Sequence, residues 1–75
     1  MVLPINRMKP GEKGTIVWLA SGDRLKKRFY NMGVIPGENI SCVVKAPGKG
    51  MRAYLVRNTV IGIRDENAGE IFVKL

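Results

Sequence analysis

The chain has 75 residues, of which 45% are hydrophobic and 25% are charged, a balance typical of one folded domain spanning residues 1–75. No apolar run approaches the roughly 20 residues that span a bilayer, and no signal peptide is recognisable, which predicts a cytoplasmic protein without membrane insertion. Thirteen Lys and Arg against six Asp and Glu give a net charge of +7, which favours an acidic or phosphate-bearing partner unless it serves only solubility.

The first predicted strand covers residues 13–20. Within it, Thr15, Ile16, Val17 and Trp18 are β-branched or aromatic, the residue types that strands favour. Both faces of this segment are partly apolar, so the alternation of side chains leaves its inward face undecided.

The next predicted element is one short helix. Leu25, Phe29 and Met32 fall at i, i+4 and i+7, which places three large apolar side chains on one stripe. Either Ser21 or Asp23 can cap the first turn by accepting hydrogen bonds from its free N–H groups. We expect the apolar stripe to be buried against the strands.

Glycines and prolines mark the ends of these elements. Gly33 is expected to end the helix with a positive φ, which a residue without Cβ adopts easily. Pro36 and Gly37 then predict a type II turn, and Pro10 and Gly11 repeat the same signal before the first strand. Each turn leads into an extended apolar run, so both are predicted entries to strands.

Four further strands complete the predicted sheet. They cover residues 38–45, 51–57 and 59–64, with a closing strand at Ile71 and Val73. Residues 47–50 read as a hairpin loop, Asn58 as a tight turn, and Asp65 as the cap of a single helical turn. This order predicts a mostly β fold, a small closed antiparallel barrel of five strands with one short α-helix between the first two strands. Closure would hide the sheet edges, and the helix would seal one mouth.

The sequence offers little to catalysis. It contains no histidine, the commonest general base, and a single cysteine, Cys42, which is too few for a Cys-rich metal site and suits a reducing compartment. Cys42 lies among apolar residues and is predicted to be a small buried side chain. The adjacent carboxylates Asp65 and Glu66 are explained by capping. We therefore predict a protein that is not an enzyme, with no catalytic residue, no metal site and no cofactor.

Several segments also match the pattern of a known family. The most specific is Asn31-Met32-Gly33-Val34-Ile35-Pro36-Gly37, and the frame further includes residues 8–16, Leu25, Arg28, Phe29, residues 46–48, Ile61, Ile63, Arg64, Ala68, Ile71 and Val73. In these positions the chain resembles the FeoA family, small cytoplasmic components of bacterial ferrous iron uptake, and the C-terminal domains of iron-dependent repressors. The resemblance implies an SH3-like β-barrel. It also implies that Ile16, Leu19, Tyr54 and Val56 point inward, with a bulge or strand end between the first two.

The resemblance also implies a role. FeoA-like proteins act with FeoB, a membrane transporter that has a cytoplasmic GTP-binding domain. By resemblance, this chain is a non-catalytic accessory or regulatory protein that binds the cytoplasmic GTPase portion of a FeoB-type transporter. For the contact surface we predict the basic helix and the neighbouring loop, with the residues Arg24, Lys27, Arg28, Lys49 and Arg52.

Two other functions stay open at this point. The net charge, with Trp18 and Tyr54 as a stacking platform, also suits a small basic β-barrel that binds RNA or DNA. Roles in the core or on the barrel surface explain these two aromatic residues as well. A small barrel can also self-associate through exposed strands, which would give a homo-oligomer.

Overall fold

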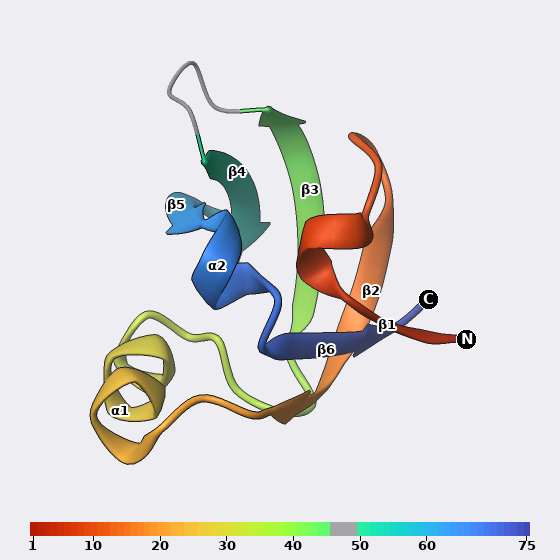
Figure 1. Ribbon diagram of the computed structural model, residues 1–75. Coiled ribbons are helices and arrows are strands. Elements are labelled where there is room, and N and C mark those ends of the chain that lie inside the picture. Colours follow the sequence, from red (N-terminus) through yellow and green to blue (C-terminus); the bar gives the residue numbers. More distant parts are fainter. Residues whose placement is uncertain (46–49) are drawn as a thin grey trace.

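The computed structural model describes residues 1–45 and 50–75, and Figure 1 shows their arrangement. The elements, in chain order, are β1 (Val2–Pro4), the 3₁₀-helix η1 (Ile5–Arg7), β2 (Lys13–Leu19), α1 (Asp23–Asn31), β3 (Asn39–Lys45), β4 (Met51–Val56), β5 (Thr59–Arg64), α2 (Asp65–Ala68) and β6 (Ile71–Lys74). The fold is therefore mostly β, as the sequence predicts, and the two termini lie on the same side of the molecule.

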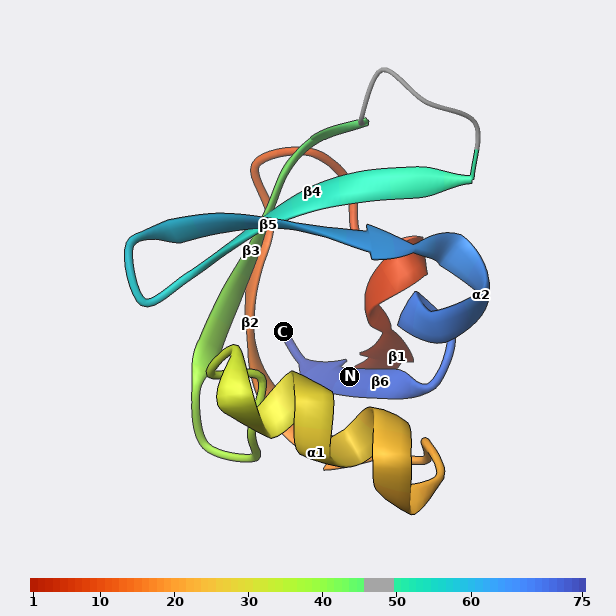
Figure 2. The same cartoon turned by 90° about the vertical axis from the view of Figure 1, so that its left-hand side faces the viewer.

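All six strands belong to one antiparallel sheet with the order β1-β6-β2-β3-β4-β5. The sheet curls around the core (Figure 2), but in the described part of the chain its edge strands β1 and β5 do not pair with each other. The prediction of a closed five-stranded barrel is therefore wrong. An additional N-terminal strand pairs with β6, and α1 follows the second strand instead of the first.

The core draws on every strand except β1, and on both helices and the N-terminal segment. Its buried hydrophobic members are Ile5, Met8, Ile16, Leu19, Phe29, Val34, Ile40, Cys42, Tyr54, Val56, Ile63, Ala68, Ile71 and Val73. The inward positions that the family pattern implies in β2 and β4 are confirmed. The register of β2 against β6 shifts between Ile16 and Trp18, which is the bulge that two inward residues three positions apart require.

The two Pro-Gly turns form as predicted. Gly11 and Gly37 have φ angles of 92° and 95°, and in each turn the residue after the glycine donates its N–H to the carbonyl three residues earlier. The glycine N–H groups bond to the sheet, because Gly11 donates to the carbonyl of Cys42 and Gly37 to that of Ile16. These turns therefore fix where the chain enters β2 and β3.

The predicted helix caps are wrong in both places. Gly22 is the N-cap of α1, and neither Ser21 nor Asp23 bonds to the free N–H groups of its first turn. Asp65 is the first residue of α2 and not its cap. Glycine is tolerated at an N-cap, and acidic residues in the first turn still face the positive end of the helix dipole, so both helices begin without a side-chain cap.

Gly33 ends α1 in the predicted way, with a φ of 90°. Replacing it with Ala should lower the free energy of unfolding by roughly 1–2 kcal/mol, because an L-residue is strained in this conformation. The added Cβ would also lie 3.1 Å from Cδ of Arg57. Chemical denaturation measures the loss. Gly22→Ser is the control, since Gly22 has a negative φ, open space around it and an N-cap position that suits serine; an equal loss there would contradict the explanation.

Candidate binding surface

Helix α1 is attached to the core through one part of its apolar stripe. Phe29 is buried at 4% exposure and Leu25 is half-buried, but Met32 is 40% exposed. The prediction that all three are buried is therefore wrong for Met32. The helix ends at Asn31, and Met32 follows as its C-cap with helical backbone angles, so its side chain continues the stripe beyond the part that packs on the core. Figure 2 shows α1 lying across one end of the curled sheet.

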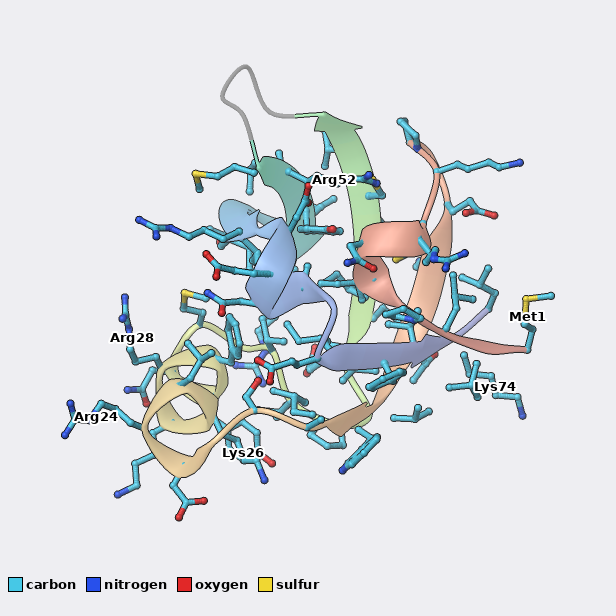
Figure 3. The ribbon with its side chains drawn as sticks, viewed as in Figure 1. Met1, Arg24, Lys26, Arg28, Arg52 and Lys74 are labelled. Atoms are coloured by element: carbon cyan, nitrogen blue, oxygen red, sulfur yellow. The ribbon has the colours of Figure 1, made fainter. Side chains whose placement is uncertain are left out.

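The basic residues predicted on α1 are exposed. Arg24, Lys27 and Arg28 all face solvent, and within the described ranges no carboxylate forms an ion pair with any of them. Arg24 and Arg28 are four residues apart, and Figure 3 shows both projecting from the same side of α1, away from Lys26. Helix α1 therefore presents uncompensated positive charge beside the exposed methionine.

A groove of about 450 Å³ runs along this side of α1. Leu25, Phe29 and Met32 give its helical wall an apolar lining, and Arg28 adds a guanidinium. The helix thus contributes one basic and three apolar side chains, all within about two turns. Sequence periodicity predicted the apolar stripe but not that part of it would line an open groove.

The opposite wall of the groove comes from β4, β5 and α2. Its residues are Met51, Gly62, Ile63, Arg64 and Asn67. The residues from Gly62 to Arg64 are consecutive in β5. Successive side chains of a strand point to opposite faces, so three consecutive lining residues mean that the groove runs along the edge of β5. Because β5 is an edge strand of the sheet, this wall includes strand backbone as well as side chains.

Arg52, the last of the five predicted contact residues, has internal partners. Its Nη1 donates to the carbonyl of Met8 at 3.3 Å, and its Nε lies 3.3 Å from Oδ1 of Asp65. That carboxylate oxygen is buried and has no hydrogen bond in the described residues, so the guanidinium compensates its charge. Arg52 thereby connects β4 with the segment after η1 and with α2. Figure 3 shows it apart from Arg24 and Arg28, and Lys49 lies outside the described residues.

The two aromatic residues considered for base stacking are in different environments. Trp18 is 57% exposed and stacks on Phe72 of β6, with ring centroids 5.2 Å apart. Tyr54 is fully buried, and its hydroxyl donates to the carbonyl of Ile5 at 3.1 Å. They cannot form one platform. The partner of Trp18 was not predicted, because cross-strand neighbours depend on a register that the sequence does not show.

Residues 3–75 match the family model for the FeoA domain. The chain belongs to the FeoA family. This confirms the resemblance drawn from the residues, and with it an association with iron transport. The match covers nearly the whole chain, so both walls of the groove and the basic helix fall within the FeoA domain.

Solved structures support the same assignment. A crystal structure of an iron uptake regulatory protein (FeoA) is 28% identical with a TM-score of 0.88, covering 99% of this chain and 96% of that one. Iron(II) transport protein A from Clostridium thermocellum is 30% identical with a TM-score of 0.88, covering 97% of this chain and 45% of that one. IdeR from T. acidophilum, at 23% identity and a TM-score of 0.84, covers 99% of this chain and 34% of its own, and it shows the fold alone. No curated protein matches the sequence significantly.

The single thiol of the chain, that of Cys42, lies in the core. Burial raises the pKa of the Cys42 thiol, with a smaller opposing effect from Arg52, so the thiol stays protonated and unreactive as expected for a buried hydrophobe. Within residues 1–45 and 50–75, no three His, Cys, Asp or Glu side chains are grouped to hold a metal ion. None of the helices described is long and apolar enough to cross a bilayer.

Proposed function

We propose that this chain is a non-catalytic accessory protein of ferrous iron uptake. In this role it binds, in the cytoplasm, the GTPase portion of a FeoB-type membrane transporter. Membership of the FeoA family supports the link to iron transport. The choice of surface rests on the exposed cations of α1, which have no ion-pair partner among the described residues: Arg24, Lys27 and Arg28.

Exposed charges of this kind act mainly on the encounter with a partner. A positive helix attracts an acidic surface, raises the association rate and makes binding sensitive to salt. Arg52 has a different part in the proposal, because its guanidinium already holds Met8 and Asp65. It supports the fold away from the contact surface, while the helix makes the contact.

Reversing the charges of α1 tests the proposal. The variant with Arg24→Glu, Lys27→Glu and Arg28→Glu should bind the isolated cytoplasmic domain of the transporter about tenfold more weakly or worse, mainly through slower association. Surface plasmon resonance at two salt concentrations measures both rates. In the unchanged protein, higher salt should reduce the association rate more than it affects dissociation.

A matched control changes the same amount of charge elsewhere. Arg7, Lys13 and Lys74 are also exposed, and Figure 3 shows Lys74 on the side of the molecule opposite Arg24 and Arg28. Reversing these three to Glu should leave binding within about twofold, apart from a general reduction in charge attraction. Equal weakening in both triple variants, or unchanged binding in the α1 variant, would contradict the proposed surface.

A nucleic-acid function has one observation in its favour, the exposed Trp18 stacked on Phe72. Burial of Tyr54 removes the second aromatic face that this hypothesis used. Filter binding of a single-stranded oligonucleotide at low and moderate salt discriminates the two functions. Retention that falls steeply with salt and is lost in Trp18→Ala would favour nucleic acid over the transporter.

A further inference from the structure

We propose that the groove between α1 and β5 binds an extended segment of a partner protein that carries apolar residues flanked by carboxylates. In this arrangement the segment adds as a strand to the open edge of β5. The inference depends on the geometry of the groove and does not require the transporter to be the partner.

The shape of the groove favours an extended chain. Its β5 wall consists of consecutive residues at the edge of the sheet, and Gly62 there has no side chain to shield the backbone. A Cβ on Gly62 would lie 3.1 Å from Cε of Met51, and in the described part of the chain no other atom outside the adjoining residues comes within 4 Å of that position. An edge strand with accessible N–H and C=O groups pairs readily with another strand.

The lining of the groove favours apolar side chains in that segment. Met32 is 40% exposed and Met51 is 38% exposed, and they come from opposite walls. Phe29 and Leu25 extend the same apolar surface down to the core. Methionine side chains are flexible and polarisable and adapt to varied partners, which is why they are frequent at peptide-binding surfaces.

The charges around the groove decide between possible occupants. Arg28 on α1 and Arg64 on β5 are both exposed and belong to opposite walls, and none of the described residues that line the groove carries a carboxylate. A segment with an acidic residue on each side of its apolar centre would meet a guanidinium on each wall. A second copy of this chain is disfavoured because its net charge is also +7.

Fluorescence anisotropy with a defined probe tests the inference. The probe is a fluorescein-labelled peptide with the sequence Ser-Glu-Leu-Phe-Leu-Glu-Ser, blocked at both ends, titrated with the full chain. Saturable binding is expected. A peptide with Lys in place of Glu should bind at least about tenfold more weakly, as should a peptide N-methylated at alternate backbone positions, which cannot complete a strand ladder.

Protein variants locate the site. Met51→Glu places a carboxylate in the groove and should weaken the probe about tenfold or more, while Val17→Glu, at an exposed β2 residue away from both β5 and the groove, should stay within about twofold. Both positions are exposed, and ¹⁵N–¹H spectra of the two variants establish that the fold is kept. Shifts in the spectra of the unchanged protein should concentrate on α1 and β5 when the probe is added.

Several results would overturn the inference. These are absence of saturable binding, an equal effect of Met51→Glu and Val17→Glu, and shifts centred on Trp18 and Phe72. Shifts at the groove that depend on protein concentration without probe would assign it to a second copy instead. The peptide assay contains no transporter domain, so its result does not depend on whether the chain binds a FeoB-type transporter. Likewise, a negative peptide result would not change the result of the charge-reversal experiment.

Discussion

Replacing Phe29 with Ala is expected to lower the free energy of unfolding by about 3–5 kcal/mol, the usual cost of removing a buried phenylalanine ring. Phe29 is buried with the core, whereas its helical neighbours Leu25 and Met32 are half-buried and exposed. Attachment of α1 therefore depends mainly on one side chain. A chain of this length has a total stability of about 4–11 kcal/mol, so the variant should lose from about a quarter to all of it.

Urea denaturation followed by far-ultraviolet circular dichroism and by Trp18 fluorescence measures this loss. Tyr30→Ala is the matched control, because Tyr30 is the next residue of the same helix and is exposed. It should cost less than about 1 kcal/mol. Coincident transitions from the two probes would mean that α1 and the sheet unfold together. A loss for Phe29→Ala no larger than that for Tyr30→Ala would contradict the assigned role of the ring.

Local signals in the sequence predict the turns and helix ends that require a residue with a positive φ. Gly33 and Gly37 adopt the positive φ angles expected of them. Asn58 also has a positive φ, but Arg57 shares it, because a tight hairpin turn places both of its central residues in the left-handed region. No pattern in the sequence marks an arginine for that conformation, so the first of the two central turn residues was missed.

The N-terminal segment shows why the strand count and the closure were wrong. β1 has only three residues and includes Pro4, so it carries no alternation that could indicate a strand. It exists because β6 offers a partner. Ile5 and Met8 then follow it into the core, where both are fully buried. These contacts join residues more than forty positions apart in the chain, as in the hydrogen bonds from Tyr54 and Arg52.

The groove could not be predicted for the same reason. Its walls come from α1, the start of β4, the end of β5 and α2, which are brought together only by the curl of the sheet. The one local signal was Met32, placed directly before the glycine that ends the helix. A large apolar residue at a helix C-cap has no assured burial, and in this chain it faces an open space.

Tyr54→Phe is expected to lower the free energy of unfolding by about 0.5–1.5 kcal/mol at neutral pH. The hydroxyl of Tyr54 donates to the buried carbonyl of Ile5, which also accepts from the N–H of Met8, so the variant loses one of the two hydrogen bonds to this acceptor. Chemical denaturation measures the difference between the two proteins. Val56→Ala, a cavity variant in the same strand, provides a comparison in which stability falls without the loss of a hydrogen bond.

The difference in free energy of unfolding between the unchanged protein and Tyr54→Phe also depends on pH, because the phenol of Tyr54 can ionise. Burial, with a smaller contribution from Cys42, raises the pKa of Tyr54 to about 12, whereas in the unfolded chain it is near 10. Between these values the unfolded chain binds fewer protons, so raising the pH favours unfolding. The unchanged protein should therefore lose about 2–3 kcal/mol from this group between pH 10 and pH 12. Tyr54→Phe should lack that loss, and parallel pH profiles for the two proteins would show that the buried phenol does not resist ionisation.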